Sequence, residues 1–83
     1  MKGSKLPTLL RIKDYRFFFF SREEPRQHVH IHSQKGEAKF WLDPQIELAK
    51  NYNLSKKQLN EIEKIIEDHH ETFVKAWEEH FGS

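Results

Sequence analysis

The sequence contains no cysteine, only three glycines and three prolines, and no long hydrophobic run. Without cysteine, the chain has neither a disulfide framework nor a thiolate metal site. Its longest uninterrupted apolar run covers residues 17–20, whereas a membrane-spanning helix needs about 20 apolar residues. The basic N-terminus has no apolar stretch of signal-peptide length. We therefore expect a cytoplasmic protein without a membrane segment, folded as a single domain over residues 1–83 with a flexible start at 1–6.

The net charge of +1 hides a split between the two halves of the chain. Residues 1–57 carry twelve Lys or Arg and six Asp or Glu, whereas residues 58–83 carry two and seven. Such asymmetry directs a polyanion or an oppositely charged protein toward the basic half. A solvated helix that uses glutamate on its exposed face would give the same split, so this pattern leaves both interpretations open.

The first half of the chain has the alternation of apolar and polar residues that is typical of β-strands. Apolar stretches at 9–12 and 15–20 flank the polar pair KD, which suits a tight hairpin. The segments HVHIH at 28–32 and GEAKFWLD at 36–43 then alternate strictly. We predict a four-stranded antiparallel meander confined to residues 9–42.

Helices are predicted for the second half. Asp43 and Pro44 are typical of a helix start, so residues 44–51 are predicted to form a short helix. A second start lies at Ser55, with Gln58 three residues later as in a capping box. Apolar or aromatic side chains follow at helical spacing, at Leu59, Ile62, Ile66, His69, Phe73 and Trp77. The expected fold is therefore α+β, with one long amphipathic helix over 56–80 packed on one face of the sheet.

The histidines of HVHIH can be assigned to one face of this sheet. Residues two apart on a strand share a face, so His28, His30 and His32 lie opposite Val29 and Ile31. The helix needs an apolar sheet face, which Val29 and Ile31 supply, and the histidines are then predicted on the uncovered face. A strand that is apolar on both sides is normally buried on both. One alternate pair of the phenylalanines at 17–20 is thus expected under the helix, and the other pair beside the histidines.

A surface this apolar is typical of contact with another molecule. We therefore predict a non-enzymatic binding module whose uncovered sheet face meets a protein partner or a second copy of the chain. Nucleic acid is another candidate partner, because bases stack on aromatic rings and basic side chains meet phosphates. The predicted binding residues are His28, His30, His32, Glu37, Lys39, Trp41, Arg16, Arg22 and Arg26.

His28 and His30 are also candidates for catalysis or for a metal. Their α-carbons would lie about 6.6 Å apart on a strand, which allows two imidazoles to meet one zinc ion. No further ligand motif accompanies them, so neither a metal nor another cofactor is predicted. As an alternative function, the pair could cleave RNA without metal, one acting as general base and the other as general acid. A third interpretation is that these histidines are the solvated side of an ordinary strand.

Several segments, taken in order, resemble a known family. They are PTLLRI at 7–12, YRFFFFS at 15–21, PRQHVHI at 25–31 and GEAKFWLDP at 36–44. Together they resemble the domain of unknown function 4160 family of small prokaryotic proteins, and the resemblance extends to Phe81. It implies a place in gene pairs that are similar to toxin–antitoxin modules, without assigning catalytic or binding residues. His28 and His30 occupy the family's H-x-H segment, and His32 falls outside it.

Overall fold

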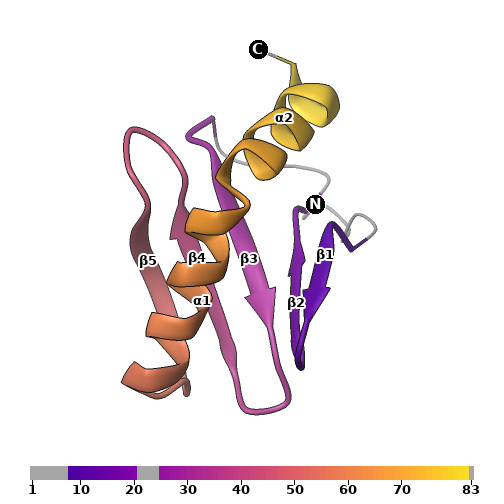
Figure 1. Cartoon of the computed structure of the whole chain (residues 1–83). Coiled ribbons are helices and arrows are strands. Elements are labelled where there is room, and N and C mark those ends of the chain that lie inside the picture. Colours follow the sequence, from indigo (N-terminus) through magenta and orange to yellow (C-terminus); the bar gives the residue numbers. More distant parts are fainter. Residues whose placement is uncertain (1–7, 21–24, 83) are drawn as a thin grey trace.

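The computed structural model describes residues 8–20 and 25–82, which form an antiparallel sheet with both helices on one of its faces (Figure 1). The five strands lie side by side in chain order. Within the described ranges, no helix is long and apolar enough to cross a membrane. The elements are β1 (Leu10–Ile12), β2 (Tyr15–Phe18), β3 (His28–His32), β4 (Glu37–Trp41), β5 (Glu47–Tyr52), α1 (Lys56–Asp68) and α2 (His70–Phe81).

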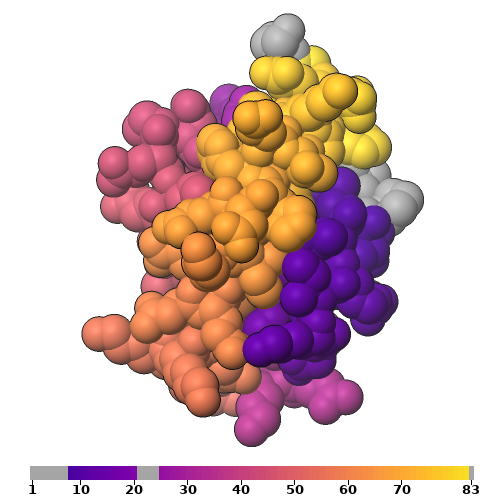
Figure 2. All heavy atoms as spheres, in the orientation of Figure 1, coloured from indigo at the N-terminus to yellow at the C-terminus, as the bar shows by residue number. Residues whose placement is uncertain are grey.

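The hydrophobic core lies between the sheet and the two helices. Phe17 stacks on Phe73 of α2 with ring centroids 5.5 Å apart, and Phe19 meets Trp77 edge-on at 5.2 Å. Burying each such ring contributes roughly 1.5–3 kcal/mol. Helix side chains hide most of β3 and β4 in the view of Figure 2. The prediction that one alternate pair of these phenylalanines lies under helices is therefore confirmed.

The prediction of a short helix at residues 44–51 is wrong, because most of this stretch forms the fifth strand, β5. Asp43 and Pro44 lie in the turn before it, joined by a cis peptide bond, and do not start a helix. The strand pairs antiparallel with β4 and gives hydrogen-bond partners to an edge that four strands would have left open. Helix formation over so few residues is unfavourable on its own, so pairing with a neighbouring strand prevails.

The prediction of one continuous helix over 56–80 is also wrong, although no strand interrupts it. The helix breaks at His69, whose backbone N–H is shared between the carbonyls of Ile65 and Ile66 at 3.1 and 3.2 Å. The two helices on either side of the break diverge in Figure 1, and α2 turns toward β2. There its aromatic side chains pack on the phenylalanines of residues 17–20. The break thus lets one helical segment cover two parts of a twisted sheet.

The start of α1 follows the predicted capping box. The Ser55 hydroxyl accepts a hydrogen bond from the Gln58 backbone N–H at 3.1 Å, and the Gln58 side-chain oxygen accepts one from the Ser55 N–H at 3.0 Å. A helix leaves its first N–H groups without helical partners, and this box satisfies two donors at the boundary. The helix start is therefore encoded locally.

A polar clasp joins the β1–β2 hairpin to α1. The Tyr15 hydroxyl donates to one Glu61 carboxylate oxygen at 2.8 Å, and the Lys13 ammonium donates to the other at 3.0 Å. Burial and the neighbouring carboxylate raise the pKa of Tyr15 to about 12. The hydrogen bonds from Tyr15 and Lys13 lower the pKa of Glu61 below its ordinary value of 4.5. The charged form of Glu61 is thus the form that the fold favours.

Candidate functional site

The sheet face turned away from the helices, here called the open face, carries its side chains in three rows across the strands. The register of the sheet defines the first row as Arg11, Arg16, His32, Glu37 and Tyr52. Tyr52 is 72% exposed, and Glu37 is exposed as well. The first row therefore presents two arginines, one carboxylate and an accessible aromatic ring to the solvent.

The second row runs across Phe18, His30, Lys39 and Lys50. The Phe18 ring stacks on His30 with centroids 5.7 Å apart, and Phe20 meets His30 edge-on at 4.5 Å. The second phenylalanine pair thus lies on the histidine side, as predicted. Phe18, however, is only 4% exposed, so the expectation of a broadly apolar open surface is wrong. What this row presents to solvent is mainly an imidazole and two ammonium groups.

The third row consists of His28, Trp41 and Glu47. Two cations lie over the Trp41 ring: the Arg26 guanidinium carbon is 4.2 Å from its centroid and the Lys39 nitrogen 4.6 Å. Arg26 is also held by a hydrogen bond from its Nε to the Asp43 carbonyl at 2.8 Å. Trp41 therefore positions two positive charges at this end of the open face.

His28 differs from its prediction, because its side chain is fully buried. Its ring lies 5.1 Å from the Trp77 ring of α2 and 5.6 Å from Trp41, and its Nδ1 donates to the Arg26 carbonyl at 2.7 Å. A side chain of α2 thus contacts the first residue of β3. The expectation that His28 lies clear of the helices is wrong, and His28 and His30 are not jointly exposed.

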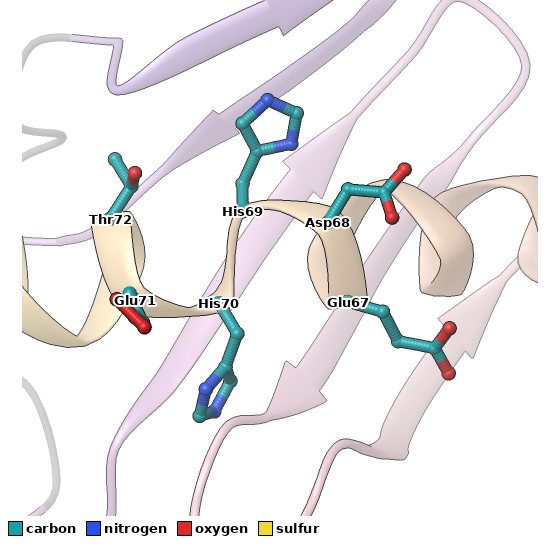
Figure 3. A pocket seen from close by; sticks show the side chains of 6 residues that line it. All are labelled: Glu67, Asp68, His69, His70, Glu71 and Thr72. Carbon is teal, nitrogen blue, oxygen red and sulfur yellow. The ribbon is translucent and has the colours of Figure 1, made fainter.

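No group of three or more His, Cys, Asp or Glu within residues 8–20 and 25–82 is arranged to hold a metal ion. A hollow at the helix break is lined by two histidines, His69 and His70. Their imidazoles point to opposite sides of the chain, so they do not meet at one point (Figure 3). His69 Nδ1 donates to the Ile65 carbonyl at 2.9 Å, and His70 Nε2 donates to the Leu42 carbonyl at 2.9 Å. These hydrogen bonds link the helix junction to the last turn of α1 and to the residue that follows β4.

The open face is positively charged, and the helices on the other side are negatively charged. The two helices, residues 56–68 and 70–81, carry four lysines against seven carboxylates. Across the three rows and the edge beside Trp41, the structure gathers five cations and two carboxylates. They are Arg11, Arg16, Arg26, Lys39 and Lys50, with Glu37 and Glu47.

Seven of the predicted binding residues are brought together at the open face: His30, His32, Glu37, Lys39, Trp41, Arg16 and Arg26. His28 is buried, and Arg22 lies outside the described residues. Lys50 and Tyr52 were not among the predicted binding residues, because residues 44–51 were assigned to a helix. The pattern K-x-Y at 50–52 is the signal that a strand assignment would have used.

The chain matches the domain of unknown function 4160 (DUF4160) over residues 14–78. It belongs to the DUF4160 family. This span begins in the β1–β2 hairpin and ends within α2, so it includes the second, third and fourth strands of the open face as well as β5. A search of curated proteins finds no match, and neither does a search of solved structures.

Proposed function

We propose that this DUF4160 protein is a non-enzymatic binding module that holds single-stranded nucleic acid on its open face. The observation that carries the proposal is the position of the charge: five cations gather on the sheet face that the acidic helices leave uncovered. Lys and Arg side chains meet phosphates, and aromatic rings stack on bases without regard to sequence.

Several cations are held in place before any ligand arrives. The Arg16 guanidinium carbon lies 5.5 Å from the Phe18 ring centroid, and Arg26 and Lys39 both rest on Trp41. A side chain that is already ordered loses less conformational freedom when it binds a phosphate. The negative helices on the other side repel a polyanion and so orient its approach toward the open face.

We propose binding without catalysis because the surroundings of His28 do not suit a group that transfers a proton. A general acid or base must come within hydrogen-bond reach of the proton that it transfers. His28 is fully buried and its Nδ1 is bound to the Arg26 carbonyl. The alternative of RNA cleavage by His28 and His30 acting together is therefore not carried forward. The place in a toxin–antitoxin-like gene pair that the resemblance implies remains part of the proposal.

Charge reversal tests the binding proposal. Arg11→Glu with Lys50→Glu should weaken binding of a labelled single-stranded 12-mer by about ten-fold or more, measured by fluorescence anisotropy at about 0.1 M salt. The slope of log K against log salt should fall by about 0.7 for each phosphate that the variant no longer neutralises. Lys64→Glu with Lys75→Glu is the matched control, because it changes the net charge equally on the helices.

The control should bind within about two-fold of the wild-type protein, since exposed charges more than about 10 Å apart are largely screened at ordinary salt. Equal reductions of affinity in both variants would mean that net charge alone attracts the strand. A wild-type protein that does not bind RNA or DNA oligomers at low salt would exclude the proposal.

A protein partner or a second copy of the chain is the second candidate, and the edge strand β5 favours it. All six of its side chains are exposed, including Leu48 at 42% and Tyr52 at 72%. An uncovered edge strand offers backbone groups that another strand can pair with. Sedimentation of the wild-type protein as a dimer that Leu48→Glu dissociates would support this candidate, whereas a wild-type monomer at high concentration would exclude self-association.

A further inference from the structure

A hollow on the open face has side chains suited to a single nucleotide. It extends from Phe20 and His30 across β4 to β5, where Glu37, Lys39, Lys50 and Tyr52 contribute to its lining. Glu37 and Tyr52 are direct cross-strand partners in one row, and Lys39 and Lys50 are partners in the next. Adjacent rows are two residues apart along a strand, about 6.6 Å. A carboxylate beside an aromatic ring therefore lies one row from two ammonium groups.

Three of these side chains have their polar atoms available. Within the described ranges, no hydrogen bond or ion pair engages the Glu37 carboxylate, the Lys50 ammonium or the Tyr52 hydroxyl. Tyr52 is 72% exposed, whereas Phe18 is buried and Trp41 already carries two cations. Among residues 8–20 and 25–82, Tyr52 is the exposed aromatic ring of the open face, so a base can stack on it.

The carboxylate gives the hollow a preference among bases. Every base has a π-face, so stacking on Tyr52 does not discriminate. A carboxylate accepts hydrogen bonds and donates none, and it pairs with the exocyclic amino group of cytosine. Uracil and thymine carry a carbonyl oxygen at that position, which Glu37 would repel. Cytosine and uracil therefore form a matched pair of ligands that differ at this group.

We propose that the hollow is a nucleotide subsite in which Tyr52 stacks the base, Lys39 and Lys50 hold the phosphate, and Glu37 selects bases with an exocyclic amino group. This inference rests on the proposed binding of single-stranded nucleic acid. It adds a base preference and names the residue that determines it. Because the selection involves the base alone, it applies to RNA and DNA alike.

Charged residues on edge strands also have a simpler role, since Lys and Glu discourage unwanted strand pairing. That role does not depend on which base is present. Base selectivity therefore separates a nucleotide subsite from a protected sheet edge.

The experiment compares oligo(rC) with oligo(rU), and oligo(dC) with oligo(dT), all 12 nucleotides long and at one salt concentration. The wild-type protein should bind each cytosine strand about five-fold more tightly than its partner, the effect of roughly one net hydrogen bond. Glu37→Gln should bring both ratios close to one, because an amide donates as well as accepts. Tyr52→Ala should weaken binding of all four strands.

Glu47→Gln is the matched control, because it removes the other open-face carboxylate from a position outside the hollow. Glu47 pairs with Arg26 at 3.7 Å, so this change alters the affinity for all four strands in the same way. It should leave the cytosine preference unchanged. Equal wild-type affinity for cytosine and uracil strands would overturn the subsite while leaving nucleic-acid binding intact, as would a preference that survives Glu37→Gln. No binding of any strand would overturn both proposals together.

Discussion

At the scale of single residues, the three histidines of HVHIH have three different surroundings. His28 is enclosed by two tryptophan rings, His30 is half-buried against two phenylalanines, and His32 is half-buried beside Arg16. Alternation along the strand places all three on one face, but it does not reveal what else covers that face. The buried histidine is therefore expected to support the fold, and the other two to support binding.

Replacing the buried histidine should destabilise the protein. His28→Ala removes a fully buried ring and the hydrogen bond from its Nδ1 to the Arg26 carbonyl. We expect the free energy of unfolding to fall by about 2–4 kcal/mol, because truncation leaves a cavity and an unpaired carbonyl. Urea denaturation followed by tryptophan fluorescence measures this change. The control His32→Ala should cost less than about 1 kcal/mol, and equal destabilisation of the two variants would contradict the assignment.

At the scale of elements, the sequence predicts those parts of the fold that local patterns encode. Apolar stretches and alternation predict the first four strands, β1 to β4, and the capping box predicts the start of α1. β5 was not predicted, because all its side chains are exposed and burial therefore imposes no alternation of apolar and polar residues. The sequence around His69 contains neither glycine nor proline, the residues that usually indicate a helix break. Both features depend on contacts with distant segments, which a local pattern does not contain.

The clasp between the β1–β2 hairpin and α1 predicts a pH dependence of stability. Hydrogen bonds from Tyr15 and Lys13 lower the pKa of Glu61 in the folded protein. A lowered pKa means that the stabilisation is present above the unfolded value near 4.5 and is lost as pH falls through the folded value. Glu61→Gln should therefore be less stable than the wild-type protein at pH 7, and this difference should shrink on acidification.

Urea midpoints between pH 7 and pH 3 measure this difference. Glu67→Gln is the control, because Glu67 is an exposed carboxylate of the same helix. Its difference from the wild-type protein should be small and nearly constant over this range. A Glu61→Gln difference that stays constant between pH 7 and pH 3 would contradict the clasp.

At the scale of the whole molecule, the sheet and the helices separate the charges of the chain. The sequence contains this split between its halves, but it does not show that the two halves face in opposite directions. The structure adds that geometry, since both helices lie on one side of the sheet (Figure 1). The strand register places the open-face cations on the other side. Lys50 and Tyr52 join the candidate site because β5 extends the sheet. The site is thus a product of the fold.

Amide chemical-shift mapping tests binding at the open face, because it locates a bound strand on the folded, unmodified protein. A single-stranded cytosine 12-mer would be titrated into ¹⁵N-labelled wild-type protein at low salt. We expect concentration-dependent shifts of the β3, β4 and β5 amides, largest around Lys39, Lys50 and Tyr52. The exposed amides of α1 and α2 should stay unchanged. Shifts concentrated on the helices, or no shifts at a millimolar excess of the strand, would contradict binding at the open face.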